Sequence, residues 1–202
     1  MVSLTGSVGA GVATMQAAAN NITKVSLELG GKAPAIIMND ADLDLAVRAI
    51  VASRMINTGQ VCNCAERLYV QEGVYDDVVE RLSAAFKNVT WGDPATQKGL
   101  DMGPLITASA LQRVEQKVAD AVAAGATIVT GGRRAGTTGF FFEPTLLTNV
   151  TQQMDIMQHE TFGPVLPVMK FSTLDEAIAL ANDSDYGLTS SIYTCNLNTA
   201  ML

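Results

Sequence analysis

The chain has 202 residues, and 13 Lys and Arg against 20 Asp and Glu give a formal net charge of −7. Apolar residues make up 48% of the sequence and charged residues 16%, a balance that excludes intrinsic disorder. The length suits one ordinary α/β domain or one and a half, and an acidic chain without a basic run argues against a nucleic-acid partner.

Strand-length apolar runs alternate with helix-length amphipathic stretches, which predicts an α/β fold with three layers, a mostly parallel sheet covered by helices. The first half begins with a strand at 2–5, a glycine turn at 6–11, a helix at 12–20, strands at 25–29 and 35–38, a helix capped by Asp40 that ends near 58–59, a strand at 67–71 and a helix at 74–86. The second half has a loop at 91–104, a helix at 107–124, a strand at 127–130, extended segments at 140–147 and 165–171, a helix capped by Thr173 and a strand at 188–194.

Targeting and cysteine patterns indicate a cytoplasmic protein. The N-terminus lacks a signal-peptide pattern, and no apolar run approaches the ~20 residues of a membrane helix. Three cysteines, an odd count, indicate a reducing compartment rather than a disulfide framework. A single histidine argues against a metal site. Both ends are abrupt, so we expect a piece of a longer polypeptide.

The first glycine-rich segment, GSVGAG at 6–11, has two interpretations. Gly6 and Gly11 have the spacing of a phosphate loop, but Val12 and Ala13 follow where Lys and Ser or Thr would stand. A nucleotide-hydrolysing loop is therefore not expected. The segment is either a tight strand-to-helix turn or a helix N-terminus whose backbone N–H groups bind an anion.

The segment GQVCNC at 59–64 contains a candidate nucleophile. Its Cys-x-Cys spacing is not that of a redox or zinc motif, and only His159 is left to complete a ligand set. Cys62 lies in a glycine-containing loop before an expected strand, a location typical of nucleophiles. The alternative is that Cys62 and Cys64 are both small buried apolar side chains.

Other polar residues near these segments also allow two interpretations. Glu28 interrupts an apolar strand, where it is either paired or has a raised pKa, as suits a general base. The alternative is that it lies with Ser26 on the solvent-exposed face of an alternating strand. His159 is interpreted as an exposed loop residue, since no GxSxG elbow accompanies it. Lys32 is interpreted as a solvated loop lysine.

Taken together and in this order, the motifs resemble those of the aldehyde dehydrogenase superfamily. Glu28 and Cys62 lie 34 residues apart, as that family expects. The resemblance spans essentially all 202 residues, and it is closest to bacterial members that act on lactaldehyde or glycolaldehyde. Four segments carry it: TGSVGAG at 5–11 (cofactor turn), LELGGK at 27–32 (glutamate signature), GQVC at 59–62 (cysteine signature) and ETFGP at 160–164 (nicotinamide-side motif).

The resemblance implies NAD-dependent oxidation of a small hydroxyaldehyde to its carboxylic acid. Cys62 is then the catalytic nucleophile, which forms a thiohemiacetal and, after hydride transfer to the nicotinamide, a thioester. The Cys62 backbone N–H holds part of the oxyanion. Glu28 activates the water that hydrolyses the thioester.

The resemblance also implies how NAD is held. Gly6, Ser7 and Gly11 border the pyrophosphate, Glu160 bonds the nicotinamide ribose hydroxyls, and Phe162 packs nearby. Residues 1–24 then correspond to a remnant of the NAD-binding domain, a turn plus helix. Residues 25–202 correspond to the aldehyde dehydrogenase catalytic domain without its C-terminal part.

The family's full subunit is more than twice as long, so the resemblance implies a fragment truncated at both ends. Such a fragment lacks most of the cofactor domain and one oxyanion donor, and we expect it to oxidise aldehydes poorly by itself. The full-length parent is expected to be a cytoplasmic homo-oligomer, a dimer or tetramer. Its expected partner is a small aldehyde, with no metal, nucleic acid or membrane.

Two other classes of protein remain as alternatives. An NAD-independent cysteine esterase or acyl transferase would use Cys62 and Glu28 for ester hydrolysis that NAD does not affect. A non-enzymatic domain fragment would show no turnover but would still melt cooperatively.

Overall fold

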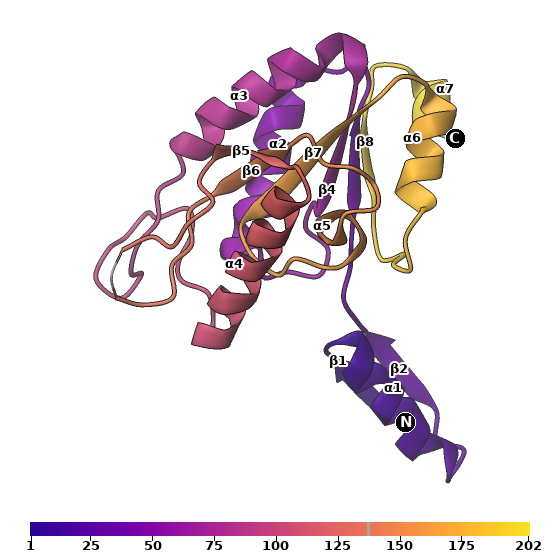
Figure 1. The fold of residues 1–202 in the computed structure, drawn as a ribbon. Helices are drawn as coiled ribbons and strands as arrows, with labels where there is room; N and C mark the ends of the chain where they lie inside the picture. The colour runs from indigo at the N-terminus through magenta and orange to yellow at the C-terminus, as the bar shows by residue number, and fades with distance from the viewer. Residues whose placement is uncertain (137) are drawn as a thin grey trace.

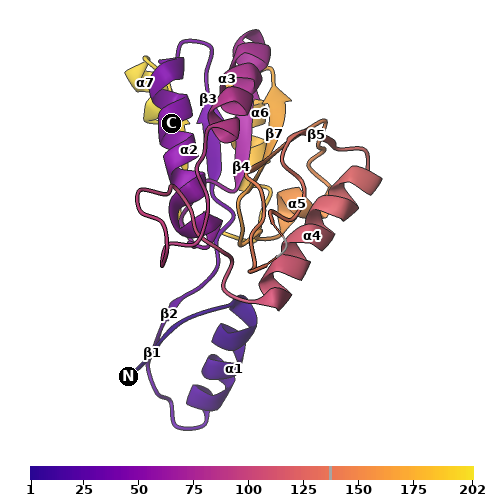
Figure 2. The same cartoon turned by 90° about the vertical axis from the view of Figure 1, so that its left-hand side faces the viewer.

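The computed structural model describes residues 1–136 and 138–202. Within these ranges the named strands form a two-stranded sheet near the N-terminus and a six-stranded sheet in the rest of the chain. The first sheet and its helix, residues 1–28, stand apart from the larger layered body in both views (Figure 1 and Figure 2). We call residues 1–28 the N-terminal unit and residues 34–202 the large unit.

The N-terminal unit consists of β1 (Val2–Thr5), α1 (Val8–Ala19) and β2 (Val25–Glu28), with β1 and β2 parallel. α1 begins earlier than the expected residue 12 because Ser7 caps it, its Oγ accepting from Ala10 N at 3.3 Å. Residues 25–28 pair with β1 rather than with the larger sheet. The expected second domain, 25–202, therefore includes a strand, β2, that pairs with the expected first segment, 1–24.

In the described part of the large unit, the strand order is β5-β6-β7-β4-β3-β8. Neighbouring strands are parallel except for the antiparallel pair β5 and β6, which confirms a mostly parallel sheet. The strands are β3 (Pro34–Ile37), β4 (Arg67–Gln71), β5 (Thr127–Thr130), β6 (Thr145–Thr148), β7 (Val165–Phe171) and β8 (Ser191–Tyr193).

Helices cover both faces of this sheet, so the expected three layers are present (Figure 2). The alternation along β4 shows why: Leu68 and Val70 enter one buried cluster, and Tyr69 enters the other. One cluster includes α2 (Leu43–Met55) and α3 (Tyr75–Lys87). The other includes α4 (Ala108–Ala123), α5 (Asp155–Gln158) and α6 (Leu174–Asn182).

Side-chain caps set several helix starts, and one differs from expectation. Thr173 caps α6 as expected. Asp42, not Asp40, caps α2, with its Oδ1 accepting from Leu45 N at 3.0 Å. Asp40 instead accepts from Thr194 Oγ1 at 2.8 Å, a partner distant in the sequence. The fold ends with a short helix, α7 (Leu197–Ala200).

Two expected extended segments form shorter strands than predicted. The segment 140–147 is a strand at Thr145–Thr148, and 188–194 is one at Ser191–Tyr193. Among the residues that the structure describes, no helix combines the length and apolar character needed to cross a membrane.

Candidate active site

A cavity of about 760 Å³ lies where the N-terminal unit meets the large unit. Five of the expected site residues line it: Gly6, Ser7, Cys62, Glu160 and Phe162. The remaining wall residues come from the ends of β1 and β2, the loop before β4 and one side of α4: Thr5, Leu29, Gly30, Gln60, Val61, Ile106, Ala110, Arg113, Val114 and Lys117.

The segment 59–66 before β4, which we call the nucleophile loop after its candidate nucleophile Cys62, separates the environments of its two cysteines. Cys62 is half-buried and lies in the cavity wall. Cys64 is buried, and its Sγ contacts Val61 O at 2.9 Å. Burial raises the pKa of the Cys64 thiol, which keeps it protonated and unreactive. Of the two cysteines, therefore, Cys62 has the position of a nucleophile and Cys64 that of a packed apolar side chain.

Glu28 lies on the solvent-exposed face of β2. The strand alternates, with Ser26 and Glu28 exposed and the residues between them half-buried. Its neighbours Leu29 and Gly30 line the cavity, whereas Glu28 is not among the wall residues. The structure thus brings Cys62, Glu160 and the turn before α1 together, whereas Glu28 is the residue directly before the wall residue Leu29.

Gly11 is likewise outside the cavity wall. It is buried inside α1, and a Cβ there would lie 2.8 Å from Leu29 Cδ1. In this structure, therefore, the lack of a side chain at Gly11 allows α1 to pack against the segment that follows β2.

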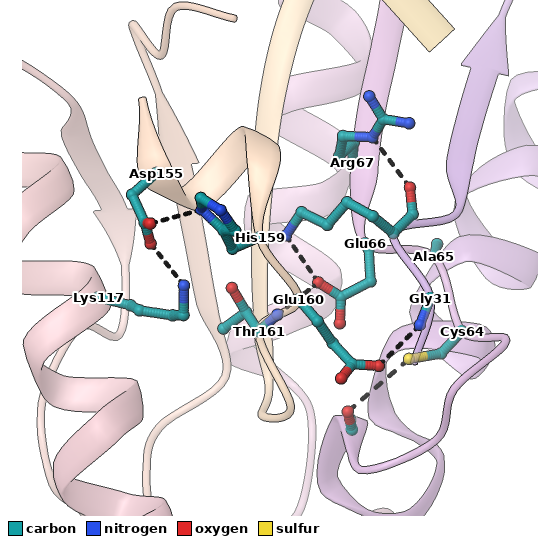
Figure 3. A network of polar contacts seen from close by, with 12 residues as sticks. Gly31, Cys64, Ala65, Glu66, Arg67, Lys117, Asp155, His159, Glu160 and Thr161 are labelled. Atoms are coloured by element: carbon teal, nitrogen blue, oxygen red, sulfur yellow. Dashed lines mark hydrogen bonds and ion pairs between the residues drawn. The ribbon is translucent and has the colours of Figure 1, made fainter. Parts of the chain in front are cut away.

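Glu160 is held against that same segment (Figure 3). Its Oε1 accepts from Gly31 N at 2.9 Å, and a Cβ on Gly30 would come 2.7 Å from Oε2. Burial raises the pKa of Glu160. The Phe162 ring, 43% exposed, lines the cavity beside it.

The residue before Glu160 is an exposed histidine, as expected. His159 Nδ1 lies 2.7 Å from Asp155 Oδ1, and Lys117 Nζ lies 2.5 Å from Asp155 Oδ2. Asp155 therefore connects His159 to a lysine of the cavity wall (Figure 3).

The expectation that Lys32 is solvated was wrong. Its side chain is fully buried, and its Nζ lies 2.8 Å from Glu66 Oε2. Arg54 Nη1 lies 2.8 Å from Glu66 Oε1. Burial lowers the pKa of Lys32 despite the carboxylate beside it. The sequence around Lys32 is a glycine-rich loop, which gives no sign that its partner lies at the end of the nucleophile loop.

The cavity fits an anionic dinucleotide on its α1 side. Gly6 and the N-cap Ser7 line the wall directly before a 12-residue helix, where backbone N–H groups and the helix dipole favour phosphate. Arg113 and Lys117 add positive side chains to the wall. Among the described residues, no group of three or more His, Cys, Asp and Glu side chains is arranged to hold a metal ion.

The model of the aldehyde dehydrogenase family matches residues 1–202. The chain belongs to this family. The aldehyde dehydrogenase chain is 64% identical over 201 residues to lactaldehyde dehydrogenase of Escherichia coli (strain K12), covering 100% of this chain and 42% of that relative. It therefore spans less than half the length of this curated relative.

Solved structures agree with that assignment. The crystal structure of lactaldehyde dehydrogenase from Escherichia coli superposes with a TM-score of 0.98 at 65% identity, covering 100% of this aldehyde dehydrogenase chain and 42% of that chain. A structure of 3,6-anhydro-L-galactose dehydrogenase in complex with NAP gives a TM-score of 0.96 at 49% identity, covering 98% and 42%. The expected fold class is confirmed.

Three polar residues, Gln60, Arg113 and Lys117, are among the wall residues of this aldehyde dehydrogenase chain to which sequence reasoning assigned no role. Arg113 and Lys117 are spaced i and i+4 on α4, so they share a helix face, but a basic pair on an amphipathic helix normally indicates a solvated surface. Gln60 Oε1 accepts from Ile106 N at 2.9 Å and so ties the nucleophile loop to the start of α4. These three residues become recognisable as cavity-wall residues only because α4 lies against the nucleophile loop in the folded chain.

Proposed function

We propose that this chain belongs to an enzyme that oxidises a small hydroxyaldehyde, such as lactaldehyde or glycolaldehyde, to its carboxylic acid with NAD. One observation carries the proposal: Cys62 lies in the wall of a cavity that Glu160, Phe162 and the turn just before α1, Gly6 and Ser7, also line. The 64% identity to lactaldehyde dehydrogenase supports the substrate class.

In this proposal Cys62 is the nucleophile. Its thiolate attacks the aldehyde carbon, a carbon–sulfur bond forms, and the carbonyl π electrons move to the oxygen. The Cys62 backbone N–H donates to that oxyanion. NAD, when bound, supplies the hydride acceptor that allows the thiohemiacetal on Cys62 to become a thioester.

Glu28 is the proposed base for the second half of the reaction. It takes a proton from the water that attacks the thioester carbon, and the Cys62 thiolate leaves as the carboxylic acid forms. This role requires the Glu28 side chain to turn from the wet face of β2 toward Leu29 and Gly30. Those residues already line the cavity and directly follow Glu28 in the sequence, so the side chain has to turn toward an adjacent part of the wall.

Cofactor contacts are proposed on both sides of the cavity. Gly6 and Ser7 would border the pyrophosphate, with Gly11 allowing α1 to approach closely. Glu160 keeps Oε2 as an acceptor for ribose hydroxyls while Oε1 holds Gly31 N. Phe162 would pack beside the nicotinamide. We propose NAD as the cofactor, although one relative is in complex with NAP, so both dinucleotides need titration.

The test is formation of the reduced cofactor by a full-length protein that contains this chain. Lactaldehyde and glycolaldehyde are each assayed with NAD and with NADP, and hydrolysis of an activated ester is assayed without either. We expect Cys62→Ala to abolish oxidation and the matched variant Cys64→Ala to retain it. Turnover that survives Cys62→Ala would overturn the mechanism, and ester hydrolysis without any oxidation would favour the esterase alternative.

For the full-length protein we further propose a cytoplasmic homo-oligomer, a dimer or tetramer. Val8, Val12 and Met15 leave about half of their surface exposed on α1, as a helix that packs in an assembly would. Cys62, Cys64 and Cys195 are free thiols, which suits a reducing compartment. Light scattering of the purified protein measures the assembly.

A further inference from the structure

Glu66 lies at the centre of a buried ion cluster beside the nucleophile loop. The residue is 1% exposed, and its partners Lys32 and Arg54 are 1% and 0% exposed. Isolated buried charges cost several kcal/mol each, and they are tolerated where charges and hydrogen bonds compensate them. Burial raises the pKa of Glu66, but Arg54 and Lys32 outweigh it and hold the pKa below its usual value. The carboxylate is therefore charged at neutral pH.

The carboxylate accepts hydrogen bonds from three separate segments. Oε2 accepts from Lys32 Nζ at 2.8 Å and from Thr161 N at 2.9 Å, and Oε1 accepts from Arg54 Nη1 at 2.8 Å. Lys32 directly follows Gly31, whose N–H binds Glu160. Thr161 directly follows Glu160 itself. Glu66 thus ties together the two sides of the Gly31–Glu160 contact (Figure 3).

Arg54 extends the cluster around the loop that carries Cys62. Its Nη2 donates to Gly59 O at 2.6 Å, and its Nη1 donates to Ala65 O at 2.8 Å. These carbonyls stand on either side of Cys62 in the sequence. The same guanidinium also donates to Thr161 O at 3.2 Å. Both ends of the nucleophile loop are therefore anchored to one side chain, which Glu66 in turn holds by its charge.

We propose that Glu66 is a positioning residue, which by binding Lys32, Arg54 and the Thr161 N–H together keeps Cys62 facing the cavity while Cys64 stays buried. The inference rests on the proposed function in that it takes Cys62 as the nucleophile. A neutral amide at this position would remove the carboxylate charge that both buried cations contact directly. Water then has to enter the cluster to solvate the Lys32 and Arg54 charges, and because it does so the loop at 59–66 becomes less ordered.

The test is alkylation of the folded chain by iodoacetamide, with the rate at each cysteine read by mass spectrometry of its peptide. In the unmodified chain, Cys62 should react about tenfold or more faster than Cys64, which is buried with a raised pKa. In Glu66→Gln this ratio should fall by about threefold or more as Cys64 becomes accessible. Cys195, an exposed thiol, is the internal reference whose rate stays unchanged.

Three further variants separate positioning from general loosening. Glu66→Asp keeps the charge and should restore most of the ratio. Phe86→Leu, a change in the core under α3, should lower the melting temperature without changing the ratio. If Glu66→Gln does not fold, Arg54→Lys replaces it, because a lysine has one ammonium in place of the guanidinium that joins Gly59 O and Ala65 O.

An unchanged ratio in a folded Glu66→Gln chain, or in Arg54→Lys where that variant is used, overturns the inference. So does an equal fall in Phe86→Leu, or a Glu66→Asp chain that behaves as Glu66→Gln does. These outcomes are independent of turnover. Failure of the proposed function appears instead as aldehyde oxidation that survives Cys62→Ala.

Discussion

The carbonyl oxygen of Cys62 lies so close to Gly31 that a Cβ on Gly31 would come within 2.1 Å of it. Gly30 stands in the same way beside Glu160. The segment after β2 therefore passes between the nucleophile loop and Glu160, at a spacing that leaves no room for side chains. These two close approaches explain why glycine stands at both positions 30 and 31, of which Gly30 lines the cavity.

Gly31→Ala should destabilise the chain by about 2–3 kcal/mol, because the obstacle is backbone and the loop has to move. The matched control is Gly9→Ala, where nothing lies within 4 Å of the added Cβ inside α1. That change should be neutral or stabilising by up to about 1 kcal/mol. Urea denaturation of both variants measures the difference, and equal effects would show that the close approach at Gly31 is relaxed in solution.

Glu28→Gln in a full-length parent should slow hydrolysis of the thioester more than formation of the reduced cofactor. An amide cannot take the proton of the attacking water, whereas the first half-reaction does not need that base. Rapid-mixing measurements should therefore show a burst of reduced cofactor followed by a slow steady rate. The control is Ser26→Ala, on the same exposed face of β2. Loss of the burst with Glu28→Gln would remove this residue from the second step.

Glu160→Gln should stabilise the chain at neutral pH and not in acid. Burial raises the pKa of Glu160, so the folded chain binds its proton more readily than the unfolded chain does, and ionisation opposes folding. Stability therefore falls as pH rises from the unfolded-state pKa, about 4.3, through the higher folded-state pKa. The amide oxygen of Gln can still accept from Gly31 N.

The measurement is thermal melting of Glu160→Gln and the unmodified chain at several pH values. We expect a gain of a few degrees or less at about pH 7, since Glu160 is half-exposed, and no gain below about pH 4. Glu80→Gln, at an exposed position of α3, is the surface control. A gain that is equal at both ends of the pH range would assign the effect to packing instead of charge.

The 202 residues alone should oxidise aldehydes at a small fraction of the rate of a full-length relative. The chain covers 42% of lactaldehyde dehydrogenase from Escherichia coli, and loss of even one oxyanion donor lowers rates by about 10²–10³. The comparison is turnover per Cys62 thiol, with alkylation used to count the accessible thiols in each sample. Turnover near that of the full-length protein would contradict the expectation.

Local sequence patterns were sufficient for the layered fold. The alternation of apolar strands with amphipathic helices depends on side-chain periodicity within each element, so the bounds of β4 and β7 follow from their own residues. The cap at Thr173 is local in the same sense, since Oγ1 bonds Glu176 N three residues later. The loop sequence likewise marked Cys62 as a candidate nucleophile, and the contiguous GQVC motif carried the resemblance that implies this role.

Contacts between distant residues decided the remaining features. Gly31 binds Glu160 across 129 positions, and Lys32 meets Glu66 across 34. A lysine after two glycines is typical of a solvated loop. Lys32 is buried only because the nucleophile loop packs against it and places the Glu66 carboxylate beside it. The same packing separates Cys64 from Cys62 and leaves Glu28 on the wet face of β2. Burial and pairing of charges depend on which segments meet in space, and periodicity along one segment does not record that.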